Sequence, residues 1–372
     1  MRTIAFVWDN FGPMHADRCD AVARHFGKRA DIVGIELGSQ SATYDWNSEA
    51  GQLFRKVTLF PGRPVDGVPT WRRLRAILSA CFRSGARDFF LCHYEHPATL
   101  FAAIVLRLCG RKVYVMGCSK FDDVKRYLRR EIFKSLFYMP YHGGIGSHRR
   151  STEYLEFLGV PAGRIEGGYN TLSLERIRQA AGAPLAPDGA PFVERRFTVI
   201  ARFVPKKNLP VILQAYRLYR DSVAHPHKLD LLGSGPLEST LRAQVKELGL
   251  EDDVFFHGFL QAPEVAHRLA ASLALLLPSV EEQFGNVVLE AQAMAVPVIL
   301  SDNCGARDEL IRTGVNGFVV EPDNPKGFAF FMRLLSQDEQ LWADMCRASS
   351  LFVGKADAVR FAESVERLVE AQ

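Results

Sequence analysis

Two cationic side chains in the second half of the sequence are well suited to bind a charged ligand. Arg202 and Lys207 follow the apolar run 197–201, which is typical of a buried strand. Ligands of parallel sheets bind at the carboxyl ends of the strands, so both side chains would lie where a ligand binds. Cations at the start of a helix suit phosphate groups, although a basic loop is more often simply solvated.

Two glutamates follow a later apolar run, 273–277. Glu282 is expected in a loop, and Glu290 lies more than one turn into a helix that begins near Gly285 and Asn286. Carboxylates accept hydrogen bonds from hydroxyl groups, so the pair suits a ribose or another polyol. The alternative is that these acids only complement the dipole of the helix.

A Gly-x-Gly turn, Gly233 to Gly235, follows the run 228–232. Closely spaced glycines let the backbone approach a ligand, but a tight turn from strand to helix needs the same residues. The dinucleotide-binding fingerprint requires a third glycine where this chain has Glu238, so that interpretation fails.

Short apolar runs alternate with longer amphipathic segments in both halves of the 372-residue chain. This alternation predicts an α/β protein with two doubly wound Rossmann-like domains that face a central cleft. We expect domains at 1–180 and 197–356, a Pro- and Gly-rich linker at 181–196, and a C-terminal helix at 357–372 that the pattern assigns to neither domain. The expected strands are 3–8, 31–37, 88–92, 112–116, 197–201, 228–232, 254–257, 273–277 and 297–301.

Composition excludes several classes of protein. The net charge of +4 is too small for a general nucleic-acid binder, so no nucleic-acid partner is expected. Seven scattered cysteines without a CxxC pair suggest neither a disulfide framework nor a zinc site, which fits a reducing cytoplasm. The apolar run at the start is expected to be a first strand and not a signal peptide, and no run approaches the ~20 residues that span a bilayer.

Five motifs of the second half, in order, resemble the retaining glycosyltransferases of family 4, which have the two-Rossmann-domain GT-B architecture. The motifs are ARFVPKKN, GSGPL, VFFHGF, EQFGNVVLEAQAMAVPVILSD and CGARDELIRTGVNGFVVEP. The resemblance implies transfer of a sugar from a UDP- or GDP-linked donor to a hydroxyl acceptor, with retention of configuration and without a metal or other cofactor. No Asp-x-Asp, the metal-binding motif of the other major architecture, occurs in the sequence.

The resemblance also implies roles for the residues introduced above. Arg202 and Lys207 would hold the diphosphate, Glu282 would orient the donor sugar, and Glu290 would bind the ribose hydroxyls. Alternative functions are a non-catalytic nucleotide-sugar-binding subunit, or an epimerase or phosphorylase on the same scaffold. The further donor-binding positions that the resemblance implies are Gly12, Gly235, His257, Phe284, Gly285 and Asn286.

The first half matches more loosely and is expected to bind a glycan or lipid-linked acceptor. WDNFGPMHADR, IEL and YDW resemble a subset of these enzymes thought to build bacterial surface polysaccharides. His15, His93 and His96 are candidates for the acceptor side, although each also suits a structural role. Many members carry a histidine where this chain has the stretch around Cys118, and no base stands beside that thiol to make it a nucleophile.

Residues 119–150 contain eight basic and three acidic side chains, a net charge of +5, interleaved with apolar ones. One interpretation is a basic amphipathic helix that lies on an anionic membrane. The other is a solvated helix whose apolar face enters the core. The protein is expected in the cytoplasm, either free or at the inner face of the cell membrane.

Overall fold

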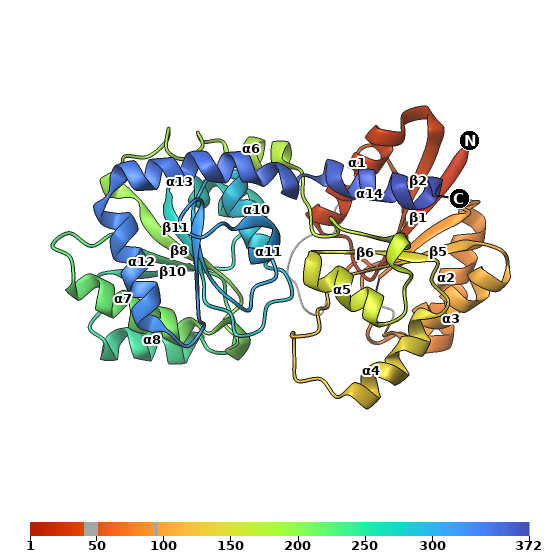
Figure 1. The fold of residues 1–372 in the computed structure, drawn as a ribbon, viewed down its shortest axis with the longest axis horizontal. Helices are drawn as coiled ribbons and strands as arrows, with labels where there is room; N and C mark the ends of the chain where they lie inside the picture. Colours follow the sequence, from red (N-terminus) through yellow and green to blue (C-terminus); the bar gives the residue numbers. More distant parts are fainter. Residues whose placement is uncertain (41–50, 93–94, 372) are drawn as a thin grey trace. The chain divides into compact units, whose positions relative to one another are not determined.

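Two parallel β-sheets, each in its own unit, organise the chain (Figure 1). The computed structural model describes residues 1–40, 51–92 and 95–371. Unit 1 is Met1–Ser173 with Asp357–Gln372, and unit 2 is Leu174–Ala356. The prediction of two Rossmann-like α/β domains is confirmed.

The sheet of unit 1 has the strand order β3-β2-β1-β4-β5-β6-β7, and every neighbouring pair of these described strands is parallel. The order reverses between β1 and β4, so the carboxyl ends of these two strands form the topological switch point. The strands are β1 (Arg2–Trp8), β2 (Ala30–Gly38), β3 (Arg55–Phe60), β4 (Asp88–Leu91), β5 (Lys112–Gly117), β6 (Gly143–Gly146) and β7 (Ile165–Glu166).

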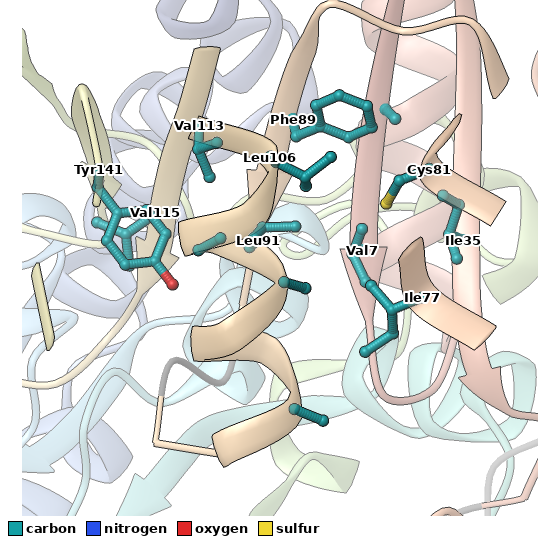
Figure 2. Packing of buried hydrophobic residues seen from close by; sticks show 14 of the residues in the cluster. Val7, Ile35, Ile77, Cys81, Phe89, Leu91, Leu106, Val113, Val115 and Tyr141 are labelled. Atoms are coloured by element: carbon teal, nitrogen blue, oxygen red, sulfur yellow. The ribbon is translucent and has the colours of Figure 1, made fainter. Parts of the chain in front are cut away.

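Helices cover both faces of this sheet, which is why its strands are apolar on both sides. Alternate residues of β1, β4 and β5, including Val7, Leu91 and Val115, point to one face and pack against Ile77 and Leu106 (Figure 2). The α-helices of unit 1 are α1 (Pro13–Phe26), α2 (Thr70–Ser84), α3 (Pro97–Leu108), α4 (Leu128–Ser135), α5 (Arg149–Phe157) and α14 (Ala358–Glu370), and the short 3-10 turns are η1 (Gly27–Arg29), η2 (Leu136–Tyr138) and η3 (Ala162–Arg164).

The C-terminal helix α14, which the sequence pattern left unassigned, belongs to unit 1. It packs beside α1 on the other face of the sheet, where the ring of Phe361 lies 5.6 Å from that of Phe6. The Ala358 N–H donates to Leu172 O at 2.8 Å, so a backbone hydrogen bond also joins the start of α14 to the segment that follows β7. The apolar stripe of α14 thus completes the core of unit 1.

The sheet of unit 2 has the order β10-β9-β8-β11-β12-β13, again with parallel pairs throughout the described strands. Its switch point lies between β8 and β11. Every strand expected from the sequence is present in the two sheets, whereas β3, β6, β7 and β13 had not been predicted. The strands of unit 2 are β8 (Arg196–Ile200), β9 (Leu229–Leu232), β10 (Val254–Gly258), β11 (Ser272–Leu277), β12 (Val298–Ser301) and β13 (Gly317–Val320).

Helices also fill the gaps between the strands of unit 2, with α7 against α12 and α6 against α9. Within residues 1–40, 51–92 and 95–371, no helix combines the length and the apolar character that crossing a bilayer requires. The α-helices of unit 2 are α6 (Leu174–Ala181), α7 (Leu209–Asp221), α8 (Glu238–Glu247), α9 (Ala262–Ala270), α10 (Asn286–Ala293), α11 (Arg307–Leu310), α12 (Pro325–Gln337) and α13 (Glu339–Phe352), and the 3-10 turns are η4 (Phe192–Glu194), η5 (Pro205–Lys207) and η6 (Val353–Ala356).

Residues 181–196, expected as a linker, lie inside unit 2 instead. The Ala186 N–H donates to Met294 O at 3.1 Å, and the buried guanidinium of Arg195 lies over the ring of Trp342 at 4.3 Å. Proline and glycine here shape a coil that packs against the unit. Both passages of the chain between the units fall elsewhere, at 173/174 and 356/357.

We expect Phe361→Ala to destabilise unit 1 by about 3–5 kcal/mol, because it leaves a cavity between α14 and the sheet. Val359→Ala on the same helix, at a side chain that is 46% exposed, is the control and should change little. Hydrogen–deuterium exchange would show the loss of protection in β1 and β4. Equal losses in the two variants, or a loss confined to unit 2, would contradict this placement of α14.

Candidate functional site

The loops that follow β8 and β11 form the candidate site of unit 2. These strands are neighbours at the switch point, where ligands of parallel sheets bind. Arg202 and Lys207 come after β8, whereas Glu282 comes after β11. The structure therefore brings both predicted cations and one predicted carboxylate to the same edge of the sheet.

An ion pair joins the two loops. Lys207 Nζ donates a hydrogen bond to Glu282 Oε2, and Ser279 Oγ donates to the same oxygen at 3.3 Å. The Lys207 and Glu282 side chains remain 19% and 14% exposed, so a ligand can still reach them. The ammonium group is thereby held in place without being sealed from solvent.

Backbone and amide groups fix the same two loops to each other. Lys206 O accepts the Val280 N–H at 2.9 Å. Asn208, in the left-handed conformation with φ 55°, donates through Nδ2 to Pro278 O at 3.3 Å and to Pro322 O at 2.7 Å. The start of α7 is therefore tied to the loop after β11 independently of the ion pair.

The side chain of Arg202 is exposed, and it makes no hydrogen bond or ion pair with the part of the chain that the structure describes. Its neighbour Phe203 is fully buried and anchors the loop. The Phe203 N–H donates to Ser234 O at 2.8 Å, and Phe203 O accepts the Leu237 N–H at 3.1 Å. A fixed backbone thus presents a guanidinium group that is open to an anion.

The Gly-x-Gly turn after β9 allows this close packing. Gly233 and Gly235 have φ of 137° and 155°. A Cβ on Gly233 would lie 1.9 Å from Ala201 O, and one on Gly235 would lie 2.7 Å from Phe203 O. Both glycines are therefore required by the loop after β8. A donor-binding role for Gly235 stays a prediction.

The start of α10 is held by buried groups. Phe284 O accepts hydrogen bonds from Cys304 Sγ and from the Ala306 N–H, both at 2.8 Å. Gly285 precedes the helix with φ 99°, and a Cβ there would lie 2.8 Å from Cys304 Sγ. Asn286 is the first helical residue. The Val288 N–H donates to Gly285 O at 2.9 Å, and the positive end of the helix dipole at this first turn favours an anion.

Glu290 lies on α10, partly exposed but closely surrounded by protein. Burial raises the pKa of this carboxyl group to about 7, and the guanidinium of Arg176 on α6 opposes the shift only in part. A carboxylate that loses hydration without gaining a donor is stabilised by any ligand that supplies hydroxyl groups. The predicted Glu290 position thus suits a polyol.

The side chain of His257, on β10, lies close to Asp230. Its Nε2 lies 3.0 Å from Asp230 Oδ1 but forms no hydrogen bond with the described residues, whereas that oxygen accepts from Arg196 Nη1 at 3.0 Å. The adjacent backbone joins two loops, because Gly258 O accepts the Gly233 N–H at 2.7 Å. A donor-binding role for His257 stays a prediction.

In unit 1, Gly12 and His15 close the first turn of α1. The Gly12 N–H donates to His15 Nδ1 at 3.0 Å, so a neutral imidazole carries its proton on Nε2. The ring of His15 also lies 4.9 Å from that of Trp8. One nitrogen of His15 thus has a structural role, and a role in acceptor binding stays a prediction.

His96 lies after β4 and Asp9 after β1, at the switch point of the sheet of unit 1. His96 Nδ1 is 3.5 Å from Asp9 Oδ2. The pairing was not predicted, because nothing in the sequence links residues so far apart. His93 and the YDW motif at 44–46 lie outside the described residues.

Two contributors to the site of unit 2 were missed in the sequence. Ser279 supports Glu282, and Asn208 ties α7 to the neighbouring loop. Asn208 carried a usable signal, because asparagine directly before an apolar helical run is typical of a helix start. Ser279 carried none, since a serine after a strand is common in loops of every kind.

The chain is similar to several known proteins, and the match to a family model lies within unit 2. Residues 190–350 match the model of the family described as Glycosyl transferases group 1. The amylovoran biosynthesis glycosyltransferase AmsK of Erwinia amylovora is 27% identical over 282 residues, which cover 72% of this chain and 65% of the relative. An N-acetylgalactosaminyltransferase of Campylobacter jejuni, named for a diphospho-undecaprenol substrate, is 29% identical over 173 residues, 46% of this chain and 44% of that protein.

Among solved structures, Anabaena HepE in complex with UDP and glucose has a TM-score of 0.72 and 16% sequence identity, with both chains covered completely. This likeness shows the fold, which contains two parallel-sheet Rossmann-like domains. The chain covers 34%, 44% and 65% of the length of three curated relatives that it matches. The family model thus matches most of unit 2.

We expect Glu290 to give the protein a specific dependence of stability on pH. A carboxyl pKa raised from 4.5 to about 7 means that the folded state holds the proton more tightly than the unfolded state. The free energy of unfolding should therefore fall as the pH rises from 4.5 to about 7 and then level off. Glu290→Gln, which cannot ionise, should gain stability over the wild type across this range, as measured by thermal unfolding.

Glu281→Gln, which alters an exposed glutamate in the neighbouring loop, is the matched control and should show no such pH-dependent gain. A difference between Glu290→Gln and the wild type that is the same at every pH would contradict the assigned pKa.

Proposed function

We propose that the chain is a retaining glycosyltransferase that moves a sugar from a nucleoside-diphosphate sugar to an acceptor hydroxyl in polysaccharide or glycolipid biosynthesis. One observation carries the proposal. Lys207 and Glu282, joined at the switch point with Arg202 on the same edge, lie in the unit that contains the family match.

The chemistry requires stabilisation of a leaving diphosphate. As the bond from the anomeric carbon to the diphosphate oxygen breaks, negative charge grows on that oxygen, and the acceptor oxygen bonds to the same carbon. Arg202 and Lys207 would stabilise this charge, and electrostatic stabilisation of this kind is usually the largest single contribution to catalysis. The acceptor proton passes to the leaving group or to solvent. No metal is needed in this account, since side-chain cations supply the positive charge.

Glu282 would act through position and not as a nucleophile. Its Oε2 holds the Lys207 ammonium, and its partial exposure leaves room for the donor sugar beside it. Orientation of a reacting group within a fixed site lowers the barrier without a covalent intermediate. Glu290 would accept hydrogen bonds from the ribose hydroxyls, which favours its ionised form and opposes the effect of burial.

The acceptor is proposed to be a glycan or a lipid-linked glycan, bound by unit 1. AmsK is named for polysaccharide biosynthesis, and the Campylobacter enzyme is named for a lipid-linked substrate. His15 and His96 remain the candidates in unit 1, and both lie after strands at its switch point. A cytoplasmic location belongs to the same proposal.

The donor and the reaction type can be established together. A thermal-shift screen with uridine and guanosine diphosphates and their sugars identifies the base, because a ligand that binds only the folded state raises the melting temperature. Release of nucleoside diphosphate that depends on an acceptor distinguishes transfer from epimerisation. Donor binding without turnover across a broad acceptor panel would favour a non-catalytic subunit, a candidate suggested by Cys118 at the position where many family members have histidine.

We expect Lys207→Ala to lower turnover by about 10²–10³-fold, the range found when one fixed donor to a developing negative charge is removed. Lys206→Ala is the matched control, because Lys206 contacts the neighbouring loop through its backbone oxygen while its side chain is exposed. Acceptor-dependent release of nucleoside diphosphate measures the rate, and the melting temperature verifies folding. A folded Lys207→Ala enzyme with nearly normal turnover would sink the assignment.

A further inference from the structure

Helix α4 of unit 1 is attached to the domain by its polar side. Glu131 is buried and accepts a hydrogen bond from the Tyr154 hydroxyl group. Lys134 Nζ and Arg126 Nη1 each lie 2.7 Å from the same hydroxyl oxygen. Burial also lowers the pKa of Lys134. The helix thus turns a carboxylate and an ammonium group toward the protein.

The segment before α4 is fixed by similar polar contacts. Arg126 Nη2 donates to Lys120 O at 2.6 Å, and its Nε donates to Phe121 O at 2.8 Å. The side chain of Lys120 is buried, with Nζ 3.3 Å from Asp122 Oδ1 and 3.6 Å from Asp123 Oδ1. These contacts give the segment a defined shape. They also pair the charged groups of Arg126 and Lys120 within the protein.

The apolar side of α4 faces solvent instead of the core. Leu128, Ile132 and Leu136 are spaced four residues apart and form one stripe along the helix. A surface helix normally buries such a stripe, so α4 is inverted and the interpretation that its apolar face enters the core is wrong. We call the side chains here that are 49–69% exposed the α4 patch: Phe121, Val124, Tyr127, Leu128, Ile132, Phe133, Leu136 and Met139.

The charge that accompanies the α4 patch is positive. Lys125, Arg129 and Arg130 are exposed, and none forms an ion pair with a carboxylate of the described chain. The acids of the segment are occupied elsewhere: Glu131 and Asp123 are buried, and the remaining one, Asp122, accepts from Arg150 at 2.5 Å. The surface therefore combines a large apolar area with unneutralised cations.

We propose that the α4 patch docks on the surface of an anionic phospholipid bilayer. Apolar side chains would enter the boundary between headgroups and acyl chains, while the three cations would meet lipid phosphates. With 8 residues, α4 is far shorter than the ~20 that span a bilayer, so the helix would lie in the interface. This docking does not depend on the proposed transferase activity.

A second copy of the chain is a less suitable occupant. In a symmetric dimer the same patch faces itself, so Lys125, Arg129 and Arg130 would approach their own counterparts. Like charges at short distance oppose such an interface, whereas an anionic bilayer complements them. Charge therefore favours the lipid surface.

The test uses the full chain and sedimentation with vesicles of phosphatidylcholine, with and without phosphatidylglycerol. The wild type should sediment with the anionic vesicles, and less so at high salt, because screening weakens the contribution of Lys125, Arg129 and Arg130. Ile132→Ser combined with Phe133→Ser should weaken binding by about tenfold or more, as should replacement of the three cations by glutamine.

Leu351→Ser is the matched control, because Leu351 is 83% exposed but lies on α13 of unit 2. Circular dichroism and the melting temperature verify that each variant is folded. The proposal is overturned if the wild type does not bind anionic vesicles, or if the α4 variants bind as the control does. It is also overturned if light scattering shows that the α4 variants convert a dimer to a monomer while vesicle binding is unchanged.

Discussion

The ion pair between Lys207 and Glu282 joins the two loops on which the candidate site depends. It can form because β8 and β11 are neighbours in the sheet, although Lys207 and Glu282 are 75 positions apart in the sequence. Pairing offsets the cost of partly burying the two charges, and it links the two loops to each other. It also holds the ammonium group within the loops that follow β8 and β11.

Other contacts hold the backbone around the pair. Buried Phe203, the turn with Gly233, and Asn208 at the start of α7 hold the backbone without using Arg202 or Lys207. The same division occurs in α4, where Glu131 fixes the helix and the apolar stripe is left free. In both places most of the structural contacts are made by groups other than those proposed to bind, so side chains can face a ligand without loss of the fold.

The sequence could predict the elements that depend on local pattern. Apolar runs gave β8 and β11, and the strand-end rule placed Lys207 and Glu282 on one edge, but their direct bond needs three-dimensional coordinates. β6 was missed because its sequence GGIG lacks strand-forming side chains, yet a Cβ on its first residue would lie 2.5 Å from Arg164 O. Amphipathic periodicity likewise predicted α4 but could not say that its polar side is the buried one, because periodicity is blind to which face the domain covers.

The central claim is that the loops after β8 and β11 bind the diphosphate of a donor. A crystal structure of the full chain with a bound nucleoside diphosphate tests it most directly. The account expects diphosphate oxygens within hydrogen-bonding distance of Lys207 Nζ and the Arg202 guanidinium, and ribose hydroxyls beside Glu290. A nucleotide bound elsewhere, with Lys207 and Glu282 paired and out of its reach, would contradict the account.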